Sequence, residues 1–324
     1  MTNKQFITEK EVSDWMRAGQ GSSLRNISPC RIKWSRSIID ISSRPFSAIA
    51  MLDLPIALAA AGMFGRLSCR LSMFGPSPDE IRAFLGDGPN LDHAGISREI
   101  TASAAKNMVL RSFVSRAGLE GLAPFVRISG AEYLCRLHEK RLPAVLVFGH
   151  NGPIPGILAG LYRLDIPVLV MKKRNTVAHP IPPNISYCFT EGGLKNRALA
   201  LKLAIDRLRS GGVVLLALWG DGSSKKDAVE FMERNIFFWP GFTAAARVSG
   251  APVIPVFPRW RQGRQFIDLH FYDPLPLPDY PPDAGDIFDR ALIKEAARWL
   301  EARIRSVPGQ IQLNQLRSFL ADRR

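Results

Sequence analysis

Cysteine is scarce in this chain, with four residues in 324 and no C-x-x-C pair among them. So sparse a set predicts neither a disulfide framework nor a structural zinc site. We therefore expect a protein of a reducing compartment, without a resident metal or cofactor. The four residues are Cys30, Cys69, Cys135 and Cys188.

Long apolar runs are also missing. The most apolar early stretch covers residues 48–65, and Asp53 and Pro55 interrupt it. An uninterrupted apolar run of about ten residues remains, whereas a bilayer-spanning helix needs about 20. We expect a buried or amphipathic helix there, and the alternative is a helix lying in a membrane interface beside Arg66 and Arg70. The first 15 residues are polar, so we expect no secretory signal.

Acidic side chains are fewer than basic ones, with 29 Asp and Glu against 43 Lys and Arg, so the net charge is +14. This excess favours a polyanionic partner, such as an anionic bilayer, an acidic carrier protein or a nucleotide phosphate. The sequence has no zinc-finger spacing, no aromatic RNA-binding signature and no clear helix-turn-helix, so we do not expect nucleic acid as a partner. A cytoplasmic location, with peripheral contact at the inner face of a membrane, fits this charge.

The remaining composition is that of a globular protein, with 46% hydrophobic and 22% charged residues. Three regions are predicted: a polar extension at 1–43, a helical region at 44–124 and an α/β domain at 125–324. Within the helical region, "SPDE" from Ser77 has the pattern of a capping box with proline at the first helical position. A second helix is expected at about 97–117.

Short apolar runs and helical patterns alternate in the C-terminal region. Between the second and third runs, leucine and alanine recur at helical spacing up to Gly211. Continuous apolar runs of this length are typical of strands buried on both faces. The predicted fold is α/β, with a mostly parallel central sheet flanked by helices. The runs lie at 144–148, 166–171, 213–218 and 252–257.

Two further elements complete this region. Residues 265–271 alternate apolar and polar side chains, which predicts a strand with one face in water. A proline-rich loop then leads to a helix expected at about 286–305.

The stretch "VFGHNGPIPG" carries His150 just past the first predicted strand of the α/β region. Ligands collect at the carboxyl ends of strands in α/β folds, and histidine titrates near neutral pH, so His150 is our candidate for a general base. The other histidines are predicted to be surface or hydrogen-bonded polar groups. They are His93, His138, His179 and His270.

Four blocks of the chain resemble the bacterial lauroyl/myristoyl acyltransferases, the late acyltransferases of lipid A synthesis, and more distantly the glycerolipid acyltransferases. The likeness extends over about residues 125–320, and 76–124 fit more loosely. The blocks are "RISGAEYLCRLHEKRLPAVLVFGHNGP", "GGLKNRALALKLAIDRLRSGGVVLLALWGDG", "GFTAAARVSGAPVIPVFPRW" and "VPGQIQLNQLRSF".

This resemblance implies transfer of an acyl group from acyl carrier protein or a coenzyme A thioester to a hydroxyl or amine of an amphipathic acceptor. His150 would be the base. The family has a histidine followed five positions later by Asp or Glu, and here that position is Pro155. Proline cannot orient an imidazole or stabilise its charged form.

Three interpretations of this departure remain open. A carboxylate from elsewhere orients His150, with Asp221 in "LWGDG" the best placed and Glu191 the next. His150 acts alone on an undemanding reaction. The chain is a non-catalytic family member that binds lipid or acyl carrier protein. Asp221 can equally belong to a plain turn between two glycines.

Basic side chains follow the second predicted strand, at Lys172, Lys173 and Arg174. If the strands are parallel, these cations share an edge with His150 and can receive phosphates of the acceptor or acyl donor. A solvated charge run is the alternative. No G-x-S-x-G motif is present, which disfavours a covalent serine enzyme.

Two glycines and an aromatic group complete the candidate binding residues. Gly152 is kept from the family motif, and Gly241 begins a predicted small-residue helix whose N-terminus suits an anion, with tight packing as the alternative. The aromatic group is expected either to line an acyl-chain channel or to belong to the core. It consists of Phe231, Phe237, Phe238 and Trp239.

Overall fold

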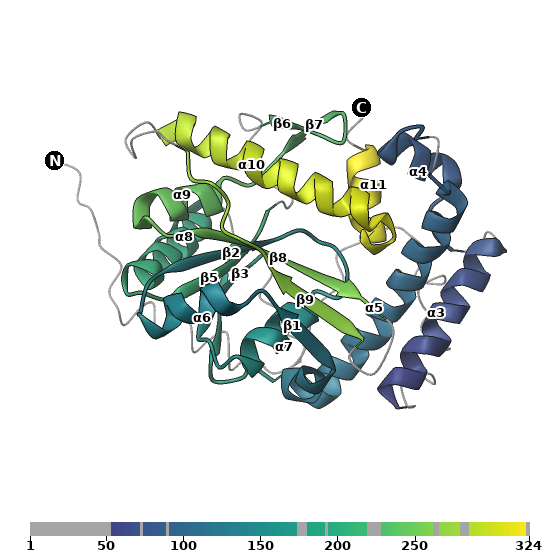
Figure 1. Cartoon of the computed structure of the whole chain (residues 1–324), viewed down its shortest axis with the longest axis horizontal. Coiled ribbons are helices and arrows are strands. Elements are labelled where there is room, and N and C mark those ends of the chain that lie inside the picture. Colours follow the sequence, from purple (N-terminus) through teal and green to yellow (C-terminus); the bar gives the residue numbers. More distant parts are fainter. Residues whose placement is uncertain are drawn as a thin grey trace.

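A seven-stranded sheet forms the centre of the protein in a computed structural model (Figure 1). Its strand order is β1-β9-β8-β2-β5-β3-β4, and a separate hairpin pairs β6 with β7. The structure describes residues 53–71, 74–88, 91–173, 180–191, 194–218, 228–261, 266–278 and 285–321.

The sheet is mostly parallel, as the sequence predicts. β8, β2, β5, β3 and β4 run in one direction, and β1 and β9 are parallel to each other but antiparallel to β8. The carboxyl ends of the five parallel strands therefore meet at one edge. The strands are β1 (Val126–Ser129), β2 (Ala144–Phe148), β3 (Val168–Lys172), β4 (Ile185–Phe189), β5 (Val213–Ala217), β6 (Ala228–Phe231), β7 (Arg234–Phe237), β8 (Val253–Trp260) and β9 (Ile267–Phe271).

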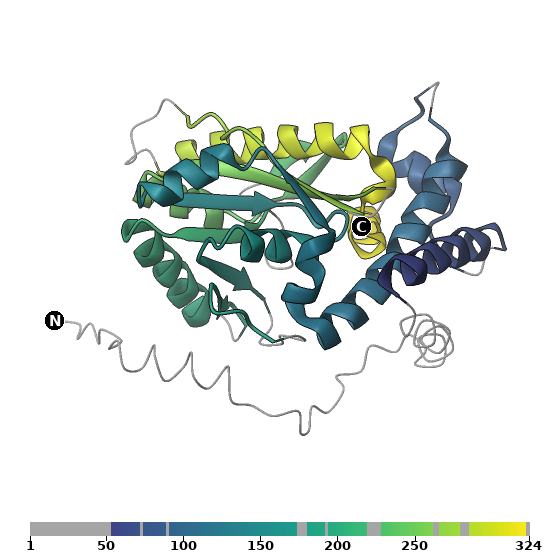
Figure 2. The same cartoon turned by 60° about the horizontal axis from the view of Figure 1, so that its bottom comes forward.

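Helices cover both faces of the sheet (Figures 1 and 2). Alternate residues of each parallel strand point to opposite sides, so one strand supplies two cores: Val145 and Val147 join one cluster, and Leu146 joins the other. The first face packs α4 (Pro78–Leu85), α8 (Leu194–Arg209), α9 (Gly241–Ser249), α10 (Gly285–Ser306) and α11 (Leu313–Ala321). The second packs α3 (Leu54–Arg70), α5 (His93–Leu122), α6 (Glu132–Glu139) and α7 (Pro155–Arg163).

The N-terminal helices confirm two local predictions. Ser77 accepts a hydrogen bond from the Glu80 amide, and the Glu80 side chain accepts one from the Ser77 amide, so the capping box is present. The apolar stretch before it forms α3, which begins at Leu54 just after Asp53 and carries Pro55 in its first turn. Proline is tolerated there because the first amides of a helix have no intrahelical partner.

The prediction of a wet face for β9 is wrong at Asp268. Only 6% of Asp268 is exposed, although Ile267 and Leu269 occupy the opposite, apolar face as expected. Arg259 on β8 pairs with Asp268 and compensates the buried charge. His270 is half-buried on the same side. On this face of β9, Asp268 is thus covered by arginine side chains that are themselves half exposed to solvent.

The predicted region boundaries at 43 and 124 stay predictions. Residues 1–43 lie outside the described part of the chain. α5 ends at Leu122, and a short 3-10 helix, η1 (Ala123–Phe125), leads into β1. Every helix in the described ranges falls short of the length and apolar character that crossing a bilayer requires.

Candidate active site

β2 brings His150 to the carboxyl edge of the sheet. All five β2 residues are buried between neighbouring strands β5 and β8, and the chain leaves the sheet after Phe148. His150 follows two residues later and is half-buried, with its ring centroid 5.7 Å from that of Phe148. The imidazole therefore lies at the surface end of a rigid strand, against a fixed aromatic ring.

The C-terminal segment holds the loop around His150. The Gln312 amide donates to the His150 carbonyl at 3.4 Å, and the Gly152 amide donates to the Gln310 carbonyl at 2.6 Å. The Gln312 side chain donates to the Gly152 carbonyl at 3.3 Å, and Asn151 forms an antiparallel bridge with Ile311. Two segments about 160 residues apart thus share one hydrogen-bond network. The roles of Gln310 and Gln312 were not predicted, because no local pattern signals so distant a pairing.

Gly152 has a backbone conformation that suits glycine. Its φ is +57°, and a Cβ there would collide with the carbonyl oxygen of Pro258 on β8. The loop therefore passes directly over β8 at this point. The backbone conformation and the close approach to β8 explain why residue 152 is a glycine. The predicted contact of Gly152 with substrate stays a prediction.

Pro155 is the first residue of α7. A fixed φ suits that position, and the missing amide hydrogen costs nothing there. Pro155 thus has a structural role in starting a helix.

The carboxylate candidates differ in what the structure says of them. Asp221 lies outside the described residues. Glu191 is exposed and follows β4, which is separated from β2 by β5 and β3. Three strand spacings amount to about 14 Å. A direct hydrogen bond from Glu191 to the His150 ring would have to cross that distance.

Lys172 and Lys173 occupy the same edge as His150. β2, β5 and β3 are parallel, and Lys172 is the last residue of β3. Burial lowers the pKa of Lys172, and the charge of Arg111 on α5 lowers it further. Its ammonium lies 5.9 Å from the Tyr187 ring centroid. Lys173 is exposed, and Arg174 lies outside the described part of the chain.

Lys106 is a cation near this edge that the sequence did not reveal, since it belongs to a helical pattern in α5. Burial lowers its pKa, Arg66 lowers it further, and Glu99 opposes them. Its ammonium lies 5.6 Å from the ring centroid of Trp260, whose amide donates to the Gln310 side chain at 2.9 Å. Lys106 therefore borders the network that holds the His150 loop.

The aromatic group belongs largely to the core. Phe231 and Phe238 are completely buried and contact each other edge to face, with centroids 5.6 Å apart. Trp239 is half-buried, and Gly241 is the buried first residue of α9. Of the two predicted alternatives, core packing describes these two phenylalanines. The side chain of Phe237 lies outside the description, and anion binding by Gly241 stays a prediction.

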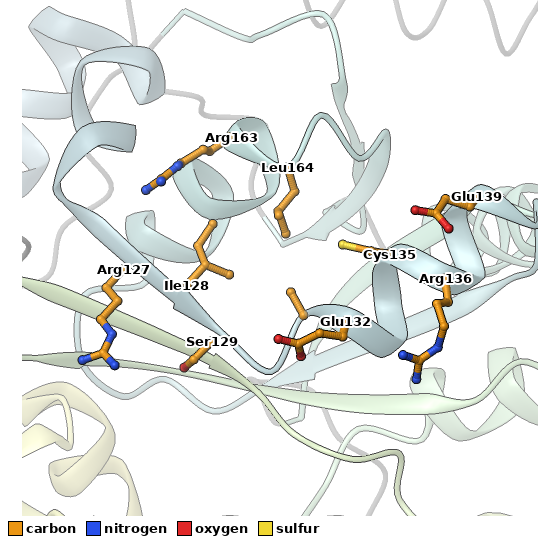
Figure 3. A pocket seen from close by; sticks show the side chains of 10 residues that line it. Arg127, Ile128, Ser129, Glu132, Cys135, Arg136, Glu139, Arg163 and Leu164 are labelled. Carbon is orange, nitrogen blue, oxygen red and sulfur yellow. The ribbon is translucent and has the colours of Figure 1, made fainter.

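An open pocket of about 660 Å³ lies elsewhere, between β1, α6 and the end of α7 (Figure 3). Its lining residues do not include His150. Burial, followed by Glu139 and Glu132, raises the pKa of the Cys135 thiol, so this thiol is protonated at neutral pH. The pocket is lined by Arg127, Ile128, Ser129, Ala131, Glu132, Cys135, Arg136, Glu139, Arg163 and Leu164.

Comparison with known proteins finds similarity to a solved structure. No family model matches the chain, and no curated protein sequence does either. The crystal structure of the 1-acyl-sn-glycerophosphate (LPA) acyltransferase PlsC from Thermotoga maritima aligns over 82% of this chain and 97% of that chain, at 14% identity and a TM-score of 0.34.

Proposed function

We propose that this protein is an acyltransferase that uses His150 as its general base. The observation that carries the proposal is the position of this half-buried imidazole, just beyond a fully buried parallel strand and in a loop held by Gln310 and Gln312. Such anchoring fixes the backbone that carries the imidazole, and base catalysis requires a positioned base.

In the proposed reaction, an acceptor hydroxyl or amine attacks the thioester carbonyl of acyl carrier protein or acyl coenzyme A. His150 accepts the proton of the nucleophile as the new bond to carbon forms. The tetrahedral intermediate then collapses, the carbon–sulfur bond breaks, and the imidazolium returns the proton to the thiolate. Asp221 is proposed to stabilise the imidazolium, in place of the family carboxylate that Pro155 replaces.

Lys172, Lys173 and Arg174 are proposed to bind a phosphate of the acceptor or donor. The support is the shared strand edge, together with the partial burial of Lys172. A cation partly removed from water attracts an anionic ligand more strongly than a solvated one.

The amphipathic acceptor is proposed to be reached at an anionic bilayer surface through α3. The outer side of this helix leaves large apolar side chains in solvent, with Met63 70%, Leu67 55% and Ile56 57% exposed. Arg66 and Arg70 flank them. α3 lies against α5 at one end of the molecule (Figures 1 and 2). An apolar stripe bordered by arginines is the pattern of a helix that lies in a membrane interface.

A second candidate function follows from Pro155 alone. Without the motif carboxylate, the chain could bind lipid or acyl carrier protein within a biosynthetic pathway and perform no chemistry.

One experiment separates the two functions. Purified protein is incubated with acyl carrier protein and coenzyme A thioesters of several chain lengths and with lysophospholipid and sugar-lipid acceptors, and products are read by mass spectrometry. The enzyme hypothesis expects product from the wild type, loss of at least about 10²-fold in His150→Ala, and no loss in His138→Gln, a half-buried histidine on α6. Saturable binding by wild type and His150→Ala, with turnover by neither, favours the binding protein.

A further inference from the structure

A second polar cluster lies on the α10 side of the sheet, at the last residue of β1 and the next-to-last residue of β9. Ser129 and His270 are register partners on these two strands. The Ser129 hydroxyl lies 2.8 Å from Nδ1 of His270, and the His270 ring meets the Tyr272 ring edge to face with centroids 4.3 Å apart. A hydroxyl and an imidazole are thus held together by two adjacent strands.

α10 adds two donors that lack an acceptor. The Arg303 guanidinium lies over the Tyr272 ring, 5.2 Å from its centroid, and the Trp299 ring lies 5.4 Å from the same ring. Within the described ranges, Arg303 Nε and Trp299 Nε1 are buried and have no hydrogen-bond partner. Buried donors in native proteins are almost always paired, so two orphans beside one tyrosine indicate a place for an acceptor.

The charge balance around these donors is positive. Arg259 donates to Asp268 Oδ2 from Nε at 2.8 Å and from Nη2 at 2.6 Å, and Arg127 approaches Asp268 Oδ1 at 3.9 Å. One buried carboxylate therefore serves two guanidinium groups, and Arg303 is a third cation. Glu132, which is exposed, is the other carboxylate whose charge acts on His270.

His270 does not add to this positive charge at neutral pH. Burial lowers its pKa most, Arg259 and Arg303 lower it further, and Asp268 and Glu132 oppose them. The neutral ring can therefore donate one hydrogen bond and accept another. Ser129 can donate a hydroxyl hydrogen to a ligand while His270 holds its oxygen in place.

We propose that Ser129, His270 and Arg303 form a binding site for a phosphate monoester group, distinct from the site at His150. The guanidinium fork matches the geometry of a phosphate with three free oxygens, whereas a carboxylate offers only two. The Trp299 indole adds a donor, and the Ser129–His270 pair adds one more, either the hydroxyl hydrogen or the second ring N–H. β9 is two strands from β2, a spacing of about 10 Å, so the proposal does not depend on catalysis by His150.

The neighbouring pocket gives room for the rest of the ligand. Its lining shares Arg127, Ser129 and Glu132 with the cluster (Figure 3). The volume of about 660 Å³ lies within the range of about 300–1,000 Å³ that is usual for small-molecule sites. The pocket lies on the α6 and α7 face of the sheet, and β1 is the edge strand, so the esterified group would reach the pocket by passing around that edge.

The test is an NMR titration of the full-length protein at low ionic strength. The signal followed is that of the His270 imidazole, which is assigned by its absence from the spectrum of His270→Gln. Inorganic phosphate, glycerol 3-phosphate and vesicles containing phosphatidic acid are added in separate arms. We expect a saturable shift with phosphate and with glycerol 3-phosphate, and an affinity about tenfold or more lower in Arg303→Gln. A shift in the vesicle arm as well identifies a lipid headgroup as a source of the phosphate.

Arg298→Gln is the matched control, because Arg298 lies on the same helix and is largely exposed beside Glu295. The proposal is overturned if phosphate gives no saturable shift of His270, or if Arg303→Gln and Arg298→Gln weaken binding equally. If Arg303→Gln fails to fold, the proposal is tested with Ser129→Ala and with Arg127→Gln, which changes an exposed residue. Each of these variants is expected to weaken phosphate binding severalfold. Unchanged affinity in both of these variants also overturns it.

Discussion

Substituting Gly152 with alanine tests how tightly the His150 loop is fixed over β8. At φ +57° an L-residue is strained by about 1–2 kcal/mol, and the added Cβ would also meet the Pro258 carbonyl. Displacing that strand or the loop resembles overpacking of a core and costs about 1–3 kcal/mol more. The expected loss of unfolding free energy in Gly152→Ala is therefore about 2–5 kcal/mol.

Gly250 supplies a control that separates strain from collision. Its φ is +68°, at the C-terminal end of α9, and a Cβ there would meet nothing within 4 Å. Gly250→Ala should thus lose only the strain, about 1–2 kcal/mol. Urea unfolding followed by far-ultraviolet circular dichroism measures both variants. Equal losses would show that the loop does not press on β8, and the argument for a rigid His150 loop would then be wrong.

Two further predictions concern the partly buried Lys106 and the exposed apolar side chains of α3. Lys106→Met should be more stable than the wild type at neutral pH, because burial lowers the folded pKa of Lys106 below its ordinary 10.5. The stability of the wild type should rise with pH between the pKa of Lys106 in the folded protein and 10.5, its ordinary value. Urea midpoints measured across this pH range should show the rise in the wild type and not in Lys106→Met. Leu67→Asp should weaken flotation with anionic vesicles about tenfold or more, with stability changed by less than about 0.5 kcal/mol. Leu142 is 45% exposed in the loop between α6 and β2, so Leu142→Asp should bind vesicles like the wild type, and equal losses would exclude α3 as the contact.

Elements with a strong local pattern were predictable from the sequence. The run "AVLVF" matches β2 residue for residue, because a strand buried on both faces must be apolar throughout. The helix before Gly211 and the capping box at Ser77 are likewise local signals.

Elements defined by distant partners were not predictable. β1, "VRIS", has an arginine and only four residues, and it is a strand because β9 pairs with it. β4, "ISYCF", follows a proline-rich stretch, and its pairing with β3 is what defines it. The antiparallel pairing of β8 with β9 was also not predictable, since periodicity does not report strand direction.

The candidate sites likewise contain features that the sequence predicted and features that it did not. The position of His150 follows from a strand that ends in a glycine-containing loop, which one stretch of sequence displays. The pairing of Ser129 with His270 joins residues 141 positions apart. His270 was expected to be a surface or hydrogen-bonded polar group, but the sequence did not indicate its partner. Its environment comes from α10, which no pattern near residue 270 reveals.

The hydrogen bonds between residues 150–152 and 310–312 make the order of chain synthesis relevant to this protein. All strands of the sheet precede residue 272, so the nascent chain can assemble them before about the last 50 residues emerge. The loop that carries the imidazole receives its final shape only afterwards. A polypeptide ending before Pro308 would therefore contain every strand of the sheet and leave that loop without its anchor.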